Sequence, residues 1–283
     1  MHVTPSPSFV RHGPIEPVSP VVVSVPHAGR DYPLALRSAI RVPLTALRVL
    51  EDRYADLLAL EACRTETLFV AQRPRAWIDL NRAEHERDPR LDDGAANLGQ
   101  PLSAKLRSGL GLVPRRAGNS GDIWQHRLSD DDVRARIIVD HHPYHAAIAE
   151  ALAAARARFG VALLLDVHSM PPLGPADRSP RLVLGDRFGK SAGARFLGRI
   201  EAVARAHGMA AAANAPYSGG HILDRHADPR GGIHAIQLEF DRTLYLDAAL
   251  DGPGAGLPAT AALLRAIIDA VADEALPGAV AAE

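Results

Sequence analysis

The apolar residues of this chain form short continuous runs that alternate with longer stretches of helical spacing. The short runs predict strands buried on both faces, and they cover residues 21–25, 67–71, 76–80, 161–167, 182–184 and 235–240. The longer stretches predict helices over residues 44–63 (open to a break near Glu51), 133–159 (kinked or restarted at Pro143), 191–207 and 258–275. Strands that alternate with helices indicate an α/β fold with a largely parallel sheet and helices on both of its faces.

One long segment, residues 81–132, interrupts this alternation. It is rich in Gly, Pro, Asp and Arg and has no hydrophobic period. A stretch of this length without regular structure is more often a functional excursion than a linker. The sequence shows no internal repeat, so we expect a single α/β domain over residues 19–276, an extended arm over residues 1–18 and a frayed tail over residues 277–283.

Composition narrows the class of protein. The 283 residues are 47% hydrophobic, and 32 basic against 33 acidic side chains give a formal net charge of -1. Such a chain can form a sizeable core, and its charge offers no attraction to nucleic acid or to an anionic membrane. No apolar run approaches the ~18 residues of a membrane span, and residues 1–20 lack a secretory h-region. A single cysteine, Cys63, excludes an intramolecular disulfide and a thiolate-rich zinc site. We expect a cytoplasmic monomer or homodimer that acts on a small molecule.

Two histidines lie where predicted strands end. His27 follows the first strand, with Gly29 allowing a tight turn, and His168 ends the strand that contains Asp166. In open α/β sheets, binding sites lie at the carboxyl ends of strands. Asp166 and His168 point the same way because side chains alternate with period two, so one could bind a metal while the other supports it. The alternatives are a turn-capping His27 and a buried Asp–His hydrogen bond.

A carboxylate could complete such a metal site. If the segment around residue 54 is helical, Asp52 and Asp56 share one helix face. An Asp at this place would give a His–carboxylate–His set, which suits zinc with one position open for water. An acidic, solvated helix face would show the same spacing.

Two further charged residues lie in or beside apolar strands. Glu239 is embedded in an apolar run, where burial would raise its pKa and suit it to acid–base chemistry. The alternative is a structural pair with a cation such as Arg242. Arg82 follows a predicted strand and could grip a carboxylate through two parallel hydrogen bonds. An internal salt bridge to Asp79 explains that arginine equally well.

Two other patterns point less clearly to chemistry. Gly185 and Gly189 open a predicted helix as a phosphate-binding loop would, but they are separated by three residues, and that loop needs four. His141 and His145 share a helix face without the glutamate of a helical zinc site, and His142 lies between them. We therefore expect no nucleotide site, and we expect the three histidines to be structural or partly exposed.

Taken in order along the chain, these segments resemble those of N-formylglutamate amidohydrolases. The matching segments are VSVPHAG (residues 23–29), Asp52-x-x-x-Asp56, IDLNR (78–82), PYH (143–145), DVHSM (166–170), Gly219–Gly220 before His226, and QLE (237–239). The resemblance spans roughly His27 to Leu246. That family is similar in fold to the zinc carboxypeptidases and aspartoacylase.

The resemblance implies a three-layer α/β/α fold with a mixed, mostly parallel sheet. The implied metal site is one zinc ion held by His27, Asp52 and His168, with Asp56 as the reserve carboxylate. The implied catalytic residues are Glu239, as general base, and Arg82, which would hold a substrate carboxylate or polarise the scissile carbonyl. The implied substrate-binding residues are Asn81, Arg82, Gly219, Gly220 and His226.

The implied reaction is zinc-dependent hydrolysis of N-formyl-L-glutamate to formate and L-glutamate, a step of histidine degradation. Two departures from the family pattern leave the substrate open: the segment after His168 is rich in proline, and His221 follows the glycine pair where an aromatic residue is expected. A deacylase for another N-acyl amino acid is therefore one alternative. A non-catalytic binding protein on this fold is the alternative from another class.

Overall fold

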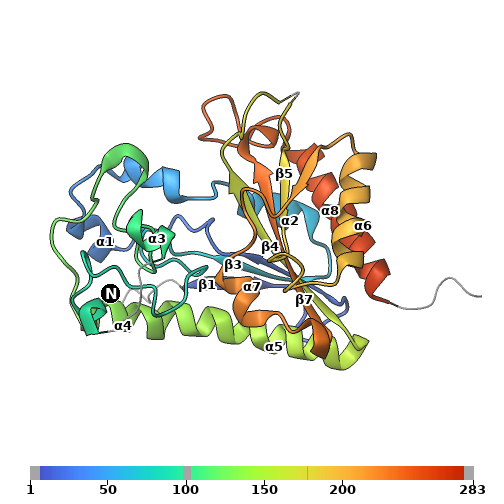
Figure 1. Cartoon of the computed structure of the whole chain (residues 1–283), viewed down its shortest axis with the longest axis horizontal. Helices are drawn as coiled ribbons and strands as arrows, with labels where there is room; N and C mark the ends of the chain where they lie inside the picture. The colour runs from blue at the N-terminus through green and yellow to red at the C-terminus, as the bar shows by residue number, and fades with distance from the viewer. Residues whose placement is uncertain (1–6, 98–102, 177, 277–283) are drawn as a thin grey trace, which may run out of the picture. The chain divides into compact units, whose positions relative to one another are not determined.

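The computed structural model describes residues 7–97, 103–176 and 178–276, which form an α/β fold (Figure 1). Within them one mixed sheet of seven strands has the order β1-β3-β2-β4-β7-β5-β6. The strands are β1 (Phe9–His12), β2 (Val21–Val25), β3 (Thr67–Ala71), β4 (Ala162–Met170), β5 (Leu182–Gly185), β6 (Ala211–Ala213) and β7 (Ile233–Asp241). The tail expected at 277–283 and residues 1–6 of the expected arm lie outside the described residues.

The helices are more numerous than the sequence predicts, and the one predicted over residues 258–275 has nearly those bounds. The α-helices are α1 (Leu34–Ala39), α2 (Ala55–Ala62), α3 (Ala104–Arg107), α4 (Asp130–Arg136), α5 (His142–Phe159), α6 (Ala194–Ala206), α7 (His221–His226) and α8 (Leu257–Ala275). The 3₁₀ segments are η1 (Leu44–Leu50), η2 (Asp93–Asn97), η3 (Gly118–Ser120), η5 (Pro229–Gly231) and η6 (Arg242–Leu244), and η4 (Ile137–His141) is a π-helix. None of the described helices is long and apolar enough to cross a bilayer.

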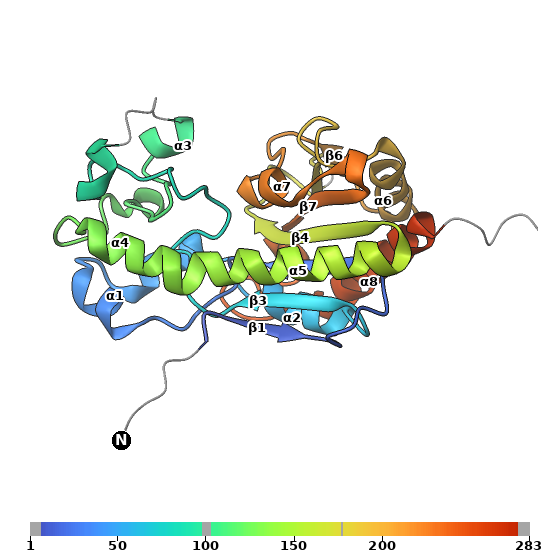
Figure 2. The same cartoon turned by 90° about the horizontal axis from the view of Figure 1, so that it is seen from below.

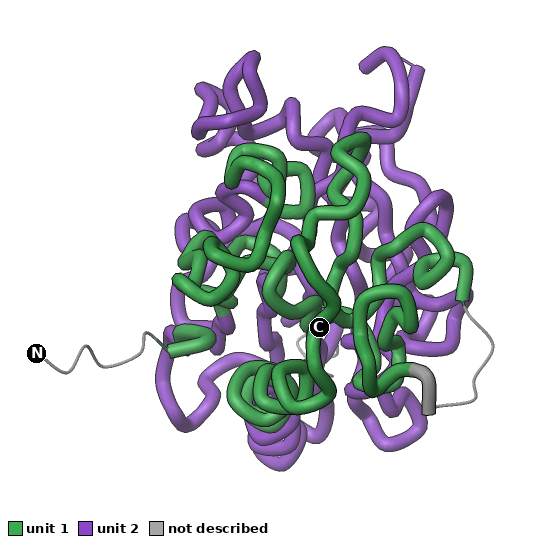
Figure 3. The backbone as a smooth tube through the Cα atoms, turned by 90° about the vertical axis from the view of Figure 1, so that its left-hand side faces the viewer, with its two compact units in different colours: residues 1–10, 26–52, 70–146 green, residues 11–25, 53–69, 147–283 purple. Residues whose placement is uncertain are grey.

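The chain divides into two compact units, coloured separately in Figure 3. Unit 1 consists of residues 1–10, 26–52 and 70–146, and unit 2 of residues 11–25, 53–69 and 147–283. Of the residues singled out from the sequence, His27, Asp52, Asn81 and Arg82 belong to unit 1. The others, His168, Glu239, Gly219, Gly220 and His226, belong to unit 2.

The centre of unit 2 is a group of buried strands. Every residue of β2 and β4 is buried, which explains their nearly continuous apolar runs in the sequence. Strand β4 runs parallel to both β2 and β7, whereas β5 is antiparallel to β7. Helices α2 and α8 pack on β2 and β4, and α6 packs on α8. Figures 1 and 2 show α5 crossing the opposite face, so the strands are covered on both sides.

Unit 1 contains most of the segment that has no hydrophobic period. Its described residues hold short helical pieces joined by irregular chain. Buried ion pairs help to fix that chain: Arg87 donates to both carboxylate oxygens of Asp92, and Arg115 donates to Asp88 at 2.9 Å. Local charge pairing of this kind leaves no periodic signature, which is why the sequence offered no helix or strand here.

The helix expected over residues 133–159 restarts near Pro143, as predicted. Helix α4 ends at Arg136, the π-helix η4 follows, and α5 begins at His142. Proline lacks an N–H and its ring clashes with the carbonyl four residues earlier. A wider turn just before the proline avoids both problems, and such π-turns occur often at functional sites.

The break considered near Glu51 is confirmed. Residues 44–63 form a 3₁₀ segment that ends at Leu50 and a separate α-helix, because Tyr54 adopts a left-handed conformation with φ 57° just before α2. Asp52 therefore precedes the helix and does not share a face with Asp56. The strand over residues 76–80 does not form, since Trp77 N–H closes a turn on Pro74 instead. Strands β1 and β6 were not predicted.

Candidate active site

Unit 2 places four polar side chains on one face of two neighbouring strands. In the parallel pair β4–β7, Asp166 is the register partner of Gln237 and His168 is the partner of Glu239. Partners in adjacent strands share a face, and so do residues two apart. All four side chains are buried. The end of β4 and β7 is therefore a polar patch set in an otherwise apolar sheet.

Hydrogen bonds orient His168 and Glu239, the predicted metal ligand and the predicted base, within this patch. Nε2 of His168 donates to Asp166 Oδ2 at 2.8 Å, and Ser24 Oγ donates to Asp166 Oδ1 at 2.9 Å. Gln237 Nε2 donates to Glu239 Oε1 at 2.8 Å. The expected Asp–His hydrogen bond is present. It fixes the imidazole so that Nδ1 is the nitrogen suited to bind a metal.

Unit 1 holds the other histidine between two carboxylates. His27 Nε2 donates to Asp79 Oδ1 at 2.7 Å, and His27 Nδ1 lies 3.4 Å from Asp52 Oδ2. The backbone also joins these segments, because Asp52 N–H donates to His27 O at 2.9 Å. All three side chains are buried. The sequence analysis considered Asp79 only as a partner of Arg82 and missed its contact with His27, because nothing in a sequence links positions 27 and 79.

Asp79 is held as an anion by its surroundings. Burial alone would raise the pKa of Asp79, but Arg75, His27 and Arg82 together keep that pKa well below its usual range. Arg75 Nε donates to Asp79 Oδ2 at 2.8 Å, while Asn81 N–H donates to Oδ1 at 2.9 Å. Asp79 is thus a fixed negative charge behind the His27 ring.

Arg82 is buried close to this carboxylate. Its Nε lies 3.8 Å from Asp79 Oδ2 but donates to Leu110 O at 3.0 Å, and its Nη1 donates to Asn81 O at 2.7 Å. Burial lowers the pKa of Arg82. The tight partner of Asp79 is therefore Arg75, and the internal salt bridge considered for Arg82 is a looser contact. Asn81 is also buried, on the same turn.

Three of the predicted substrate-binding residues, Gly219, Gly220 and His226, lie at the two ends of α7. Gly219 has φ 109°, a backbone conformation that favours glycine, and Gly220 caps α7. Buried His226 ends that helix. A Cβ at Gly185 would lie 2.7 Å from Gly219 N, so these two loops pack backbone to backbone.

In the loop from Gly185 to Gly189, which resembles a phosphate-binding loop, backbone N–H groups donate to side chains of the protein itself. The N–H groups of Asp186 and Phe188 donate to Asn214 Oδ1, and Gly189 N–H donates to Asp186 Oδ1. Amides occupied in this way are not arranged to cradle a phosphate.

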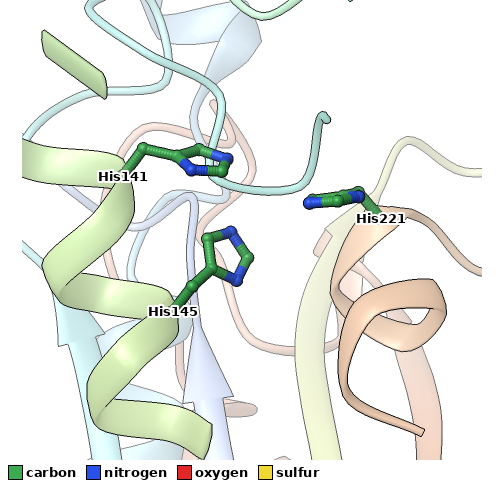
Figure 4. Close-up of side chains that lie close together, drawn as sticks. All are labelled: His141, His145 and His221. Atoms are coloured by element: carbon green, nitrogen blue, oxygen red, sulfur yellow. The ribbon is translucent and has the colours of Figure 1, made fainter. Parts of the chain in front are cut away.

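The histidines around Pro143 differ in burial. His141 and His145 are buried and donate from Nε2 to Arg82 O at 2.9 Å and to Leu80 O at 3.0 Å, while exposed His142 pairs with Glu84 at 3.0 Å. Figure 4 shows His141 and His145 projecting from successive turns of one helix. They brace the segment that carries Asn81 and Arg82.

The described residues include two sets of side chains that could hold a metal ion. One set is His141, His145 and His221, and the other is His27, Asp52 and His168. The second set has the composition that suits a catalytic zinc, and each of its imidazoles is oriented by a carboxylate of its own unit. The residues present therefore fit a resident metal ion.

Comparison with known proteins decides the family. The family model described as N-formylglutamate amidohydrolase matches residues 19–246. The chain belongs to the N-formylglutamate amidohydrolase family. The match covers every residue of the candidate site, and family membership makes the chain an amidohydrolase.

Individual relatives agree with this family. The N-formylglutamate deformylases of Pseudomonas aeruginosa and Pseudomonas putida are 28% and 26% identical over 234 residues, 81% of this chain and 82% of each relative. A crystal structure of N-formylglutamate amidohydrolase from Ralstonia eutropha JMP134 has a TM-score of 0.84 and 29% identity, covering 95% of this chain and 98% of that one. A gene product of Agrobacterium tumefaciens, 17% identical with a TM-score of 0.65 over 95% of both chains, shares the fold.

Proposed function

We propose that this chain hydrolyses the amide bond of N-formyl-L-glutamate and releases formate and L-glutamate. Support comes from the family and from two relatives named N-formylglutamate deformylase. The observation that carries the chemistry is the register of β4 and β7, which makes buried Glu239 the neighbour of carboxylate-backed His168. A proton acceptor and a metal ligand then share the strand ends where α/β enzymes bind their substrates.

The proposed metal site is one zinc ion held by His27, Asp52 and His168. The chain order supports this choice, since Ser24 and Asp166 are register partners in β2 and β4 and each histidine follows its partner by only a few residues. Three protein ligands leave a position open. When bound, the ion would supply a Lewis acid that polarises the scissile carbonyl and lowers the pKa of water.

In this proposal Glu239 moves the proton. It accepts a proton from the water whose oxygen bonds to the formyl carbon, and it delivers that proton to the glutamate nitrogen as the C–N bond breaks. The hydrogen bond from Gln237 to Oε1 holds the carboxylate in place. One carboxylate can therefore serve both steps without a second acid.

The remaining predicted residues bind substrate in this proposal. Arg82 presents a guanidinium whose Nε and Nη1 are held by backbone carbonyls, so its orientation is fixed before substrate arrives. A preorganised guanidinium suits a substrate carboxylate. Asn81 positions that arginine, while Gly219, Gly220 and His226 form the wall that faces the acyl group.

The decisive experiment measures bound metal and formate release on the same sample. Purified protein should carry about one zinc ion per chain, as expected for a single three-ligand site, and should release formate from N-formyl-L-glutamate. Parallel assays with N-acetyl- and N-succinyl-glutamate separate the proposed substrate from another acyl group, the alternative favoured by the proline-rich segment after His168. Absence of metal, together with no turnover of any of the three after zinc addition, would favour a non-catalytic binding protein.

A further inference from the structure

Unit 1 contains a cavity that the proposed reaction does not use. The cavity has a volume of about 340 Å³ and is bordered by α1, by α4 and by the turn that carries Trp77. Its charged lining consists of Arg73, Arg136, Asp132 and Asp140, and the rest of the lining is mainly apolar. This volume accommodates a small metabolite. The question is which chemical groups would satisfy the charges inside it.

Arg136 is the most unusual residue of this cavity. Only 5% of it is exposed, and its Cζ lies 3.7 Å from the ring centroid of Trp77 and 5.2 Å from that of Trp124. Its Nη1 donates to Trp77 O at 3.0 Å, but its buried Nε has no hydrogen-bond partner in the part of the chain that the structure describes. Across the same described residues no carboxylate lies within 4.0 Å of its guanidinium.

A buried guanidinium in this state favours an anionic ligand. Burial lowers the pKa of Arg136 to about 10, which still leaves it charged at neutral pH. The face of the Arg136 guanidinium stacks on Trp77. Its N–H donors point outward in the plane of the group, where a ligand can accept from them. A carboxylate that approached the edge of that plane would make two parallel hydrogen bonds to a cation that the protein has already desolvated and oriented.

Asp140 supplies the opposite charge on the same cavity. It is 4% exposed, and its Oδ2 accepts a hydrogen bond from Trp77 Nε1 at 2.8 Å. Its Oδ1 lies 4.0 Å from Arg73 Nε, beyond hydrogen-bond distance. Burial raises the pKa of Asp140, and the hydrogen bond from Trp77 and the charges of Arg73 and Arg136 offset this rise only in part, so a further cation beside Oδ1 would be favourable. The π-helix η4 carries this residue, one turn after Arg136.

A ligand for this cavity must therefore carry both charges, because a dianion would be repelled by Asp140 and a simple amine by Arg136. We propose that the cavity binds a free α-amino acid, with Arg136 holding its carboxylate and Asp140 holding its ammonium group. Pro33, Ala35, Ala39, Leu128 and Val139 line the remaining space and select an apolar side chain. This site is separate from the proposed metal site and does not depend on the proposed function.

The test is calorimetric titration of the full chain with L-leucine and with 4-methylpentanoate, which is leucine without its ammonium group. We expect leucine to bind and 4-methylpentanoate to bind at least tenfold more weakly. Replacing exposed Ala135, which lines the cavity, with phenylalanine should weaken leucine binding at least tenfold. Ala149→Phe, at an exposed position further along the same helical stretch, is the matched control and should leave binding unchanged.

A second variant isolates the ammonium contact. Asp140→Asn keeps an oxygen for the Trp77 indole, so the fold should persist while leucine affinity falls to that of 4-methylpentanoate. Three outcomes overturn the proposal: no heat with leucine, equal affinity for the two probes, or equal leucine affinity in wild type and Ala135→Phe. The last outcome would place any bound amino acid elsewhere on the chain.

Discussion

Glu239 and His168 lie side by side because they are register partners in two parallel strands, β4 and β7. Each is anchored by a polar neighbour two residues earlier on its own strand, Gln237 for the glutamate and Asp166 for the histidine. The proposed proton acceptor and the proposed metal ligand are thus built on rigid sheet rather than on loops. A site supported in this way holds its groups in place before substrate arrives.

The first prediction concerns the proposed base. Glu239→Gln keeps the shape and the hydrogen bond to Gln237 but cannot accept a proton. We expect kcat for N-formyl-L-glutamate to fall by roughly 10²–10⁴ with little change in KM. Exposed Glu150→Gln is the control for loss of a carboxylate. Near wild-type kcat in Glu239→Gln would assign the proton transfer to another group.

The second prediction concerns metal removal. Dialysis against a chelator should abolish formate release, and added zinc should restore it, because three buried ligands of the His–carboxylate–His type bind zinc reversibly. His168→Ala should carry little zinc after purification, whereas exposed His207→Ala should retain about the wild-type amount, since one ligand of three is lost only in the former. Elemental analysis measures both. Full activity in chelated protein would rule out the metal.

The third prediction concerns the carboxylate behind His27. Asp79→Asn keeps the side-chain volume but removes the negative charge from the group that accepts the hydrogen bond of His27 Nε2. Outer carboxylates of this kind typically contribute 10–100-fold to metal affinity, so competition with a chromogenic chelator should show a loss of roughly that size. Asp122→Asn, at an exposed carboxylate paired with Arg115, is the control. Unchanged zinc affinity in Asp79→Asn would mean that Asp79 pairs with Arg75 but does not support the metal site.

The fourth prediction concerns Arg82. Arg82→Lys retains a positive charge but loses the fixed donors, so we expect KM for N-formyl-L-glutamate to rise about tenfold or more, which corresponds to about 1.4 kcal/mol. Steady-state kinetics with the neutral γ-amide of the substrate provides the comparison. A variant that weakened both substrates equally would indicate that Arg82 does not recognise the side-chain carboxylate.

The fifth prediction concerns stability and pH. Arg265 donates to both carboxylate oxygens of Glu66, at 2.9 and 3.0 Å, and both residues are buried. Burial alone would raise the pKa of Glu66, but hydrogen bonds from Arg265 and Arg64 lower it below 4.5. A group with a lowered folded pKa stabilises the fold above its unfolded pKa and loses that contribution as pH falls through the folded value.

Glu66→Gln should therefore unfold more easily near neutral pH, by roughly 3–5 kcal/mol for a broken buried pair. The difference from wild type should shrink as the pH falls below 4.5, the ordinary value for this carboxyl group. Urea unfolding at several pH values measures the free energy of unfolding of each protein. A pH-independent difference would mean that packing, not charge, accounts for the loss.

The sequence predicted the strands that are buried on both faces and the histidines at their ends. Val21–Val25 has the predicted bounds, and β4 and β7 extend the predicted runs by a few residues. Such strands are recognisable because both faces need apolar side chains. The polar residues that interrupt them, such as Asp166 and Glu239, are conspicuous for the same reason.

The sequence could not predict how the carboxylates of unit 1 are placed. Asp52 precedes α2 because Tyr54 takes a left-handed conformation. Glycine or asparagine usually occupies such positions, so a tyrosine there gives no warning in the sequence. Ile78 and Leu80 are buried like strand residues, yet their segment turns, and Asp79 N–H donates to Leu112 O in a distant part of the chain. Contacts this far apart in sequence depend on tertiary packing, which hydrophobic periodicity does not record.

The reversal of one strand has a consequence for how substrate preference can evolve. Since β5 is antiparallel to β7, Leu182 at its start faces Phe240, while Met170 at the end of β4 faces Asp241. Both ends of the proline-rich stretch between Met170 and Leu182 therefore lie at the same strand ends as His168 and Glu239. Insertions or exchanges in that stretch can change the surroundings of the proposed site without moving a strand. In the proposed enzyme, the acyl group that is accepted can then vary while the strands that carry the proposed ligands stay unchanged.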